Sequence, residues 1–388
     1  MNAAHGLAAP SIGTRLPKVG TTIFTVMSAL AAERGAVNLG QGFPDFDCDP
    51  RLVDAVAGAM RAGRNQYPPM AGVAPLRQRI AEKIAALYGM RYDQDAEITV
   101  TAGATQAIFT AVLAVVRPGD EVIVLEPVYD SYIPSIELAG GTAVAVPMDA
   151  GFRVPWAAVR AAVTPRTRAI MVNSPHNPSG TILREADLRE LEAIALEHDL
   201  LVISDEVYEH MVYDGEAHQS VSRRPALAAR SFVVSSFGKT FHATGWKIGY
   251  CAAPAPLMAE FRKVPQFNVF TANAPMQYGI AEYMEDPAPW RGLPAFYQRK
   301  RDLFRGGLAA TRFRLLPCEG TFFQLVDYSA ISDLDEAGFA RWLTTEIGVA
   351  AIPLSAFYEQ PVQNRVVRFC FAKTEQTLEQ ALERLSRL

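Results

Sequence analysis

Lys239 is the residue whose surroundings most clearly suggest chemistry. It lies in the segment Ser236–Thr240, directly after the apolar run Ser231–Ser235. A lysine at the end of a strand is usually a surface charge, but a desolvated amine can form a Schiff base with an aldehyde. Ser236 and Lys239 also fit the S-x-x-K pattern of acyl-serine enzymes, yet its S-D-N and K-T-G companions are absent from the sequence. The sequence therefore favours an amine nucleophile over an acyl-serine.

Two further charges lie in apolar segments, where a buried charge needs a partner. Asp205 directly follows the apolar run Leu200–Ser204, and Tyr208 comes three residues later, close enough to share a site. The carboxylate could pair with a protonated ring nitrogen, a metal ion or an arginine. Arg368 lies within the apolar run Val366–Phe371. Its guanidinium could hold a ligand carboxylate through two hydrogen bonds or form an internal salt bridge.

Three loops that follow other apolar runs add groups suited to a flat, phosphorylated ligand. The small residues 102–105 precede a helical pattern, where free N–H groups favour an anion, although a simple tight turn has the same appearance. Tyr129 could stack on a ring or pack in the core. Two prolines and a glycine in residues 174–180 would fix Asn177 as a donor, or as an ordinary turn residue. Together with the lysine and the carboxylate, these loops supply the groups that pyridoxal phosphate needs.

The elements that must position these groups alternate between strands and helices. A helical face formed by Leu188, Leu191, Ala195 and His198 falls within Ala186–His198, between two of the strand candidates. This order predicts a mainly parallel sheet flanked by helices, which binds ligands beyond the carboxyl ends of its strands. The expected strands are Ile98–Thr101, Glu121–Leu125, Ala169–Asn173, Leu200–Ser204 and Ser231–Ser235.

The last third of the chain has a different pattern. Ser332–Gly348 is predicted to be helical, Val366–Ala372 to be a strand, and Thr374 to cap a final helix. We therefore expect an α/β fold with two parts. Residues 49–284 would form the large domain, and residues 1–48 with 285–388 a smaller α+β domain with an N-terminal arm.

Composition limits the classes of function. Over 388 residues the formal net charge is −4, which argues against a nucleic-acid binder. No G-x-G-x-x-G turn or nucleotide P-loop occurs. The longest apolar run, near 107–116, is about half a membrane span, and residues 1–20 lack a signal-peptide core. We expect a cytoplasmic protein without a metal site, zinc spacing or disulfide framework, since no C-x-x-C pair occurs among Cys48, Cys251, Cys318 and Cys370.

The motifs in this order resemble the class I aminotransferases of the aspartate aminotransferase fold, which is fold type I of pyridoxal-phosphate enzymes. The resemblance extends over nearly the whole chain. Gly40–Phe46 and Thr21–Phe24 are similar to the methionine aminotransferase branch, near the kynurenine and glutamine transaminases. The most specific matches are S-S-F-G-K-T-F at 235–241, G-W-K-I-G-Y at 245–250, N-P-S-G at 177–180 and D-E-V-Y at 205–208.

The resemblance implies a role for each matching residue toward pyridoxal 5'-phosphate. Lys239 would bind the cofactor covalently and move the proton, and Asp205 would pair with the ring nitrogen. Tyr208 and Asn177 would hydrogen-bond the phenolic oxygen, and Tyr129 would stack on the ring. Lys247 stands where aspartate aminotransferases have arginine, as in the kynurenine branch. The phosphate would be bound by Gly103, Ala104, Thr105, Ser236, Lys247 and, from the neighbouring subunit, Tyr67.

The resemblance also implies a homodimer with shared active sites and an amino acid and a 2-oxo acid as substrates. Arg368, Asn177 and the backbone at Gly42 would bind the α-carboxylate. Phe24 and, across the dimer, Phe270 would line the side-chain pocket, whereas Thr271 replaces a histidine of a kynurenine relative.

The reaction expected from this resemblance is transfer of the amino group of an apolar or aromatic amino acid, methionine first, by a ping-pong mechanism. Kynurenine, glutamine and aromatic transaminases and a cysteine-conjugate β-lyase remain alternatives. A regulator with an aminotransferase-like ligand domain is a further alternative, but it would need an attached DNA-binding domain, and the sequence shows no basic N-terminal arm for DNA.

Overall fold

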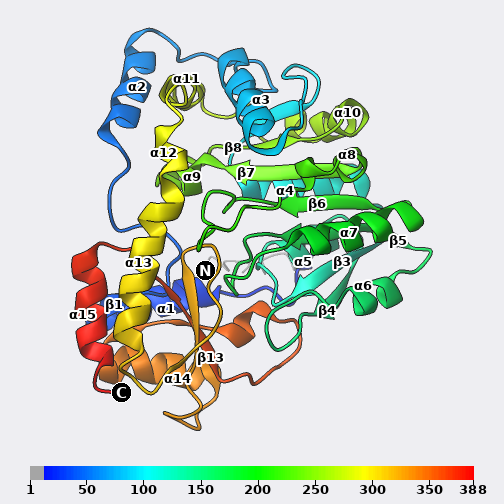
Figure 1. Cartoon of the computed structure of the whole chain (residues 1–388). Coiled ribbons are helices and arrows are strands. Elements are labelled where there is room, and N and C mark those ends of the chain that lie inside the picture. Colours follow the sequence, from blue (N-terminus) through cyan, green and yellow to red (C-terminus); the bar gives the residue numbers. More distant parts are fainter. Residues whose placement is uncertain (1–12) are drawn as a thin grey trace, which may run out of the picture.

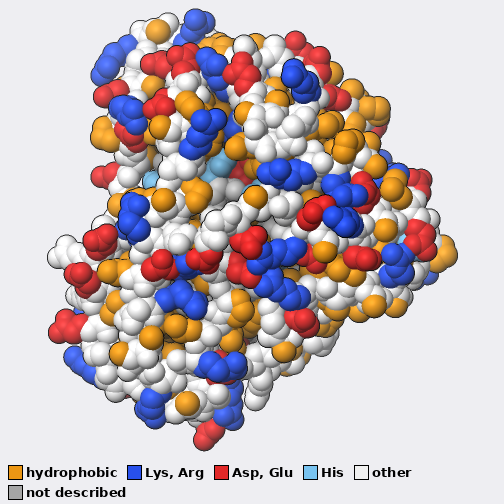
Figure 2. All heavy atoms as spheres, in the orientation of Figure 1, with side chains coloured by type: hydrophobic (Ala, Val, Ile, Leu, Met, Phe, Trp, Pro, Cys, Tyr) orange, Lys and Arg blue, Asp and Glu red, His pale blue; other side chains and the backbone are white. Residues whose placement is uncertain are grey.

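The computed structural model describes residues 13–388. Residues 1–12 lie outside the described residues. They include the first part of the expected N-terminal arm and most of the segment in which a signal peptide would lie. Within the described part, no helix is both long enough and apolar enough to cross a membrane. On the face shown in Figure 2, basic and acidic side chains are interspersed.

A seven-stranded sheet forms the larger part of the molecule (Figure 1). The strand order is β2-β8-β7-β6-β5-β3-β4, and only β8 runs antiparallel to its neighbours. The five expected strands are confirmed within one or two residues, because each is an apolar, β-branched run buried on both faces. The strands are β2 (Ile98–Thr101), β3 (Glu121–Glu126), β4 (Thr142–Pro147), β5 (Thr167–Asn173), β6 (Leu201–Asp205), β7 (Ser231–Ser236) and β8 (Gly249–Ala252).

The sequence analysis missed β4 and β8. β4 pairs only with β3 at the edge of the sheet, so five of its six residues are half-buried or exposed, and its short apolar run, Ala143–Val146, was passed over. β8 is a four-residue strand inserted between β2 and β7. Its pairing depends on contacts with strands far away in the chain, which local periodicity does not report.

Helices cover both faces of this sheet. Alternate strand residues face opposite sides of the sheet. On one side, Val122 and Val124 pack in a core with α4 (Ala104–Val115). On the other side, Ile123 packs in a separate core with α7 (Glu185–Glu197). α7 confirms the helix expected at Ala186–His198. The other helices of this part are α2 (Pro50–Arg61), α3 (Ala74–Tyr88), α5 (Tyr132–Leu138), α6 (Trp156–Ala162), α8 (Pro225–Ala228), α9 (Phe237–Thr240), α10 (Ala255–Lys263) and α11 (Ala274–Tyr283), with 3₁₀ turns η1 (Val221–Arg223), η2 (Thr244–Trp246) and η3 (Pro265–Phe267).

The C-terminal third forms an antiparallel sheet, β12-β13-β10-β9, below the first sheet in Figure 1. The N-terminal segment joins it, because β1 pairs in parallel with β11 and Leu39 accepts a hydrogen bond from the Cys370 amide at 2.7 Å. The strands are β1 (Val37–Asn38), β9 (Arg314–Leu315), β10 (Phe323–Asp327), β11 (Val349–Ala350), β12 (Ile352–Pro353) and β13 (Val366–Cys370).

The helices of this smaller part differ in detail from expectation. The helix expected at 332–348 begins only at Glu336, because Asp335 accepts a hydrogen bond from the Gly338 amide and caps it. Its last turn, η4 (Leu343–Ile347), is π-helical. Thr374 caps the final helix as expected. The helices here are α1 (Ile23–Arg34), α12 (Ala288–Arg291), α13 (Leu293–Leu308), α14 (Glu336–Trp342) and α15 (Glu375–Leu385), with the 3₁₀ turn η5 (Leu354–Phe357).

Candidate functional site

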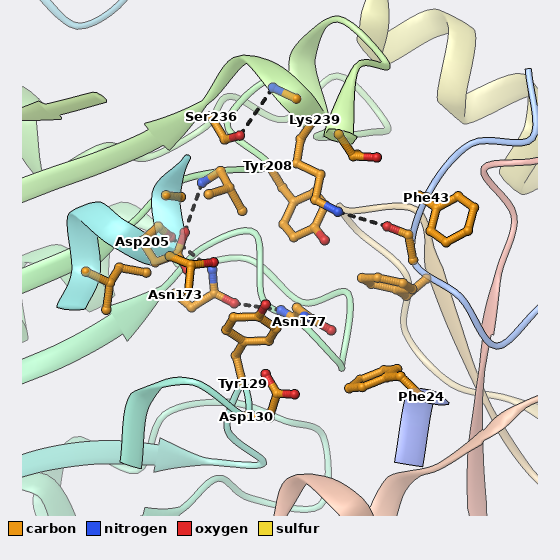
Figure 3. A pocket seen from close by; sticks show the side chains of 18 of the residues that line it. Phe24, Phe43, Tyr129, Asp130, Asn173, Asn177, Asp205, Tyr208, Ser236 and Lys239 are labelled. Atoms are coloured by element: carbon orange, nitrogen blue, oxygen red, sulfur yellow. Dashed lines mark hydrogen bonds between the residues drawn. The ribbon is translucent and has the colours of Figure 1, made fainter. Parts of the chain in front are cut away.

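A cavity of about 340 Å³ lies where the carboxyl ends of β5, β6 and β7 meet the first turn of α4. The smaller sheet and the N-terminal segment close its other side (Figure 3). The geometry therefore brings together residues that are as far apart as 24 and 368. Many of the site residues expected from the sequence line this cavity. They are Phe24, Gly42, Ala104, Thr105, Tyr129, Asn177, Asp205, Tyr208, Ser236, Lys239, Lys247 and Arg368.

Lys239 extends into the cavity from α9, the short helix that follows β7 directly. Ser236 caps this helix by accepting a hydrogen bond from the Gly238 amide at 3.2 Å. The Lys239 ammonium donates to the carbonyl of Gly42 at 2.8 Å. Burial lowers the pKa of Lys239 to about 8. The amine is thus closer to its neutral, nucleophilic form at physiological pH than an ordinary lysine.

Asp205 is the last residue of β6 and is buried. Its Oδ2 accepts a hydrogen bond from the Tyr132 hydroxyl at 2.5 Å, and its Oδ1 accepts one from the Val207 amide at 3.2 Å. Burial raises the pKa of Asp205 to about 6, and these hydrogen bonds oppose the rise. The side chain lines the cavity without an ion-pair partner within hydrogen-bond reach among residues 13–388. A protonated ring nitrogen would supply the missing positive charge.

The aromatic and amide groups expected around a cofactor ring lie on the same cavity. The Tyr208 ring packs edge-on against Phe322 and Phe323, with centroids 5.2 and 5.9 Å apart. The ammonium of Lys239 lies 5.7 Å from the Tyr208 ring centroid. Tyr129 lies on the other side of the cavity from Tyr208 (Figure 3). Burial raises the pKa of Tyr208 well above its ordinary value, so its hydroxyl remains a hydrogen-bond donor.

The first turn of α4 and the Lys247 side chain form a candidate phosphate cradle. Gly103 is the N-cap with φ +81°, a conformation that favours glycine. A β-carbon on Gly103 would lie 3.3 Å from both Cε and Nζ of Lys247, so the glycine leaves room for this cation beside the helix N-terminus. Ala104, Thr105 and Ser236 line the same part of the cavity. Backbone amides, a hydroxyl and an ammonium are suitable donors for a phosphate.

Arg368 is 1% exposed and forms no salt bridge with any carboxylate that the structure describes. Its guanidinium donates instead to Asn177 Oδ1 at 2.7 Å and to the Gly40 carbonyl at 3.1 Å. Its Nε has no partner within the described chain. Burial lowers the pKa of Arg368 to about 10, so it stays charged at neutral pH. Within residues 13–388 Arg368 thus forms no internal salt bridge, and its guanidinium can receive a carboxylate ligand.

Aromatic rings surround this guanidinium. Its Cζ lies 3.9 Å from the centroid of Phe323, 5.1 Å from Phe357 and 5.3 Å from Phe24. Gly42 fits closely beside them, because a β-carbon there would lie 2.9 Å from the Phe323 ring. The side of the cavity next to Arg368 is thus apolar and aromatic, which suits an amino acid with an uncharged side chain.

Three expected site residues do not line the cavity of this chain: Gly103, which caps α4 beside it, and the pair Tyr67 and Phe270. Tyr67 is 83% exposed and Phe270 is 43% exposed. Their rings pack on one another edge-on at 5.4 Å, away from Lys239. Both had been expected to act in the neighbouring subunit's site, and that expectation stays a prediction.

Sequence reasoning missed several residues that the fold brings to the site. Asn173 accepts the Asn177 amide at 2.8 Å and donates to the Asp205 carbonyl at 2.9 Å. Its position as the last residue of an expected strand was the available signal. Tyr132 follows Tyr129 at helical spacing, but nothing local indicated that its hydroxyl reaches Asp205. Asp130 and Phe323 also line the cavity.

The donor set fits pyridoxal 5'-phosphate in each part. It provides an amine for the aldehyde, a carboxylate for the ring nitrogen, phenol and amide groups for the phenolic oxygen, and a cradle for the phosphate. No group of three or more histidine, cysteine, aspartate or glutamate side chains among the described residues is arranged to hold a metal ion.

Comparison with known proteins agrees with this chemistry. The family model for aminotransferase class I and II matches residues 34–385. Methionine aminotransferase of Escherichia coli K12 is 50% identical over 97% of this chain and 98% of its own length. Human kynurenine–oxoglutarate transaminase 1 is 34% identical over 92% of this chain and 93% of its own.

Solved structures show the same fold. A structure from E. coli described as having a methionine aminotransferase function superposes with a TM-score of 0.96, at 49% identity, over 98% of this chain and 100% of the other. N-succinyldiaminopimelate aminotransferase of Mycobacterium tuberculosis gives a TM-score of 0.94, at 42% identity, over 97% and 100%. The Thermus thermophilus aspartate aminotransferase structures share the fold as well. This chain belongs to the aminotransferase class I and II family.

Proposed function

We propose that the protein uses pyridoxal 5'-phosphate to move the amino group of methionine to a 2-oxo acid. The observation that carries this proposal is the content of the cavity around Lys239. It holds an amine with a pKa of about 8, a buried carboxylate and a guanidinium that has no carboxylate partner within residues 13–388. The family provides the reaction class, and these three groups match the aldehyde and ring nitrogen of the cofactor and the carboxylate of the substrate.

The cofactor would be held by residues from both sides of the cavity. When bound, it supplies an aldehyde that accepts the amino group and a protonated ring that withdraws electrons from the α-carbon. Asp205 would keep the ring nitrogen protonated through its negative charge. Tyr208 and Asn177 would donate hydrogen bonds to the phenolic oxygen, and Tyr129 would stack on the ring. The phosphate would be held by donors at Gly103, Ala104, Thr105, Ser236 and Lys247.

Lys239 and Arg368 carry the steps that involve the substrate. Lys239 Nζ, once free as a neutral amine, takes the proton from the α-carbon and returns it to a neighbouring carbon, because a base with a pKa near the working pH does both efficiently. Its hydrogen bond to the Gly42 carbonyl holds Nζ on the substrate side of the cavity. Arg368, with Asn177 and the Gly42 backbone, orients the α-carboxylate.

Two observations support methionine over acidic amino acids. The aromatic side of the cavity, with Phe24, Phe323 and Phe357 around Arg368, suits a polarisable thioether. Within the described residues, the cavity has no second arginine for a side-chain carboxylate, and the carboxylate of Asp130 also lines it. The E. coli relative at 50% identity is a methionine aminotransferase.

We also propose a cytoplasmic homodimer in which each subunit completes the site of the other. The exposed aromatic pair of Tyr67 and Phe270 supports it, because large exposed aromatic surface is typical of an interface. Tyr67 would reach the partner's phosphate, and Phe270 would line the partner's side-chain pocket.

The proposed domains are residues 49–284, and 1–48 with 285–388.

Borohydride reduction of the holoenzyme followed by peptide mapping tests the cofactor assignment. The label is expected on Lys239, and a label elsewhere or none would contradict it. A panel of amino donors against several 2-oxo acids tests the substrate, with methionine expected to give the highest kcat/KM. Release of pyruvate and ammonia from a cysteine conjugate, without transfer to an added 2-oxo acid, would instead indicate a β-lyase.

A further inference from the structure

Tyr132 makes the shortest contact to the carboxylate proposed to face the cofactor ring. It is the first residue of α5 and is 3% exposed. Its hydroxyl donates to Asp205 Oδ2 at 2.5 Å, across 73 residues of sequence. The Tyr129 ring packs edge-on against it at 5.7 Å, which restricts its rotation. A buried phenol that is fixed in this way acts as a preorganised donor to one carboxylate oxygen.

The second oxygen of Asp205 has its own fixed donor. The Val207 amide reaches Oδ1 at 3.2 Å. Each oxygen therefore has one donor from the protein, and both donors hold the plane of the carboxylate in one orientation. Asn173 supports the same residue from behind by donating to its main-chain carbonyl at 2.9 Å. The carboxylate consequently cannot turn without losing a hydrogen bond in a buried environment, where an unpaired acceptor is costly.

We propose that Tyr132 is a positioning residue that orients Asp205 toward the cofactor's ring nitrogen and keeps it ionised. This inference rests on the proposed function. The hydroxyl stabilises the carboxylate over the neutral carboxyl group, because a phenol O–H donates more strongly to an anion. Without it, burial favours the neutral acid, which has no charge to attract a protonated ring nitrogen. Tyr132 acts through Asp205 and does not itself touch the ligand.

A competing explanation is that Tyr132 only fastens α5 to the end of β6. Loss of a purely structural tie would change the whole cavity and weaken every ligand to a similar extent. Loss of the proposed role would affect only a ligand that presents a basic ring nitrogen to Asp205. The two explanations therefore predict different ratios between the affinity for a ligand with a ring nitrogen and the affinity for a ligand without one.

The experiment measures the dissociation constants of the full-length apo-protein for two compounds by equilibrium dialysis. One is pyridoxal 5'-phosphate, and the other is its deaza analogue, in which carbon replaces the ring nitrogen. The Tyr132→Phe variant removes one oxygen atom. The matched control is Tyr297→Phe, because Tyr297 is also buried and its hydroxyl has no partner within residues 13–388.

We expect Tyr132→Phe to lower the preference for pyridoxal 5'-phosphate over the analogue by about tenfold, the effect of one hydrogen bond to a charged group. Tyr297→Phe is expected to leave the preference within about twofold. In an Asp205→Asn background, Tyr132→Phe should have no further effect on it, because the charge on which it acts is gone.

An unchanged ratio in Tyr132→Phe overturns the inference, even if both affinities fall, and so does an equal change in Tyr297→Phe. If Tyr132→Phe does not fold, Tyr132→His replaces it. Histidine moves the hydrogen-bond donor away from Asp205, so the ratio of the two affinities should change. An unchanged ratio again overturns the inference. If the wild-type protein binds neither compound, the proposed function fails instead, so the two failures are distinguishable.

Discussion

The molecule contains two buried clusters of the same kinds of side chain, and they differ in whether the charges are paired. Behind β7, Lys83 donates to Glu209 at 2.5 Å and to the Tyr250 hydroxyl at 2.9 Å. Glu209 also accepts from Tyr88 at 2.5 Å and from Ser235 at 2.6 Å. Burial by itself raises the pKa of Glu209, but Lys83, His210 and the Ser235 hydroxyl together outweigh it and hold that pKa far below its ordinary value.

In the cavity, by contrast, the charges have no oppositely charged partner at hydrogen-bonding distance in the described part of the chain. Lys239 has a backbone carbonyl, Arg368 has a carbonyl and an amide oxygen, and Asp205 has a hydroxyl and an amide. Burial shifts the pKa of all three toward their neutral forms, to about 8, about 10 and about 6. The paired cluster thus stabilises the fold, whereas the unpaired groups are available to ligands. In this protein, a buried charged side chain indicates a functional site only where no oppositely charged side chain is paired with it.

The largest expected effect comes from removing the unpaired lysine. Lys239→Ala should lower kcat by about 10²- to 10⁴-fold, because the other amine of the cavity, Lys247, belongs to the proposed phosphate cradle and does not replace it as proton carrier. Its melting temperature should stay close to that of the wild type, since no ion pair is lost. Steady-state kinetics and calorimetry measure both quantities. Wild-type turnover in this variant would contradict the assigned role.

The paired lysine should give the opposite pattern. Lys83→Met leaves Glu209 buried without its counter-charge, and we expect the free energy of unfolding to fall by about 3–5 kcal/mol. The kcat of the folded fraction should change far less than in Lys239→Ala. Urea denaturation followed by circular dichroism measures the loss. The double variant Lys83→Met/Glu209→Gln should recover part of it, and equal stability of the wild type and Lys83→Met would disprove the distinction between the clusters.

A smaller effect is expected at Arg368. Arg368→Ala should reduce kcat/KM for methionine by on the order of 10²-fold, the loss of hydrogen bonds between charged groups. The corresponding amine, which lacks the α-carboxylate, should react no more slowly than with the wild type. If the preference for methionine over this amine survives in the variant, Arg368 does not bind the carboxylate.

The smallest expected effect is a dependence on pH. Burial lowers the pKa of Lys239 to about 8. Above this pH most of the side chain is the neutral amine that attacks an aldehyde, and below it most is the unreactive ammonium. The rate at which the apo-protein captures pyridoxal 5'-phosphate should therefore rise about tenfold per pH unit below 8 and level off above it. Below about pH 6, protonation of Asp205 should weaken cofactor binding further. Stopped-flow absorbance measures the profile, and a midpoint near 10 would mean that Lys239 behaves as an ordinary lysine.

Much of the site was predictable because it is local in sequence. Asp205 and Lys239 each follow an apolar run, and a parallel sheet brings the ends of such runs to one edge. The family, the fold class and the aminotransferase reaction expected from the motifs are confirmed by the comparisons. The specific roles of the site residues remain predictions.

What could not be predicted depends on pairing between distant segments. β8 was missed because its partners lie far from it in sequence, and Lys83 meets Glu209 across 126 residues. The same holds for Tyr132, which only the packing of α5 against the end of β6 brings to Asp205. Local periodicity contains no information about such contacts.

The amino-acid sequence by itself determined which groups this protein has for chemistry and the strand ends from which they extend, because both follow from short patterns. Only the tertiary structure decided which of those charges are paired. Lys83 is buried and Lys239 is half-buried at the cavity, and the main difference between these two lysines is a carboxylate that folding brings to one and keeps from the other. The free energy of a buried charge depends on neighbours within a few ångströms, and the fold alone determines those neighbours.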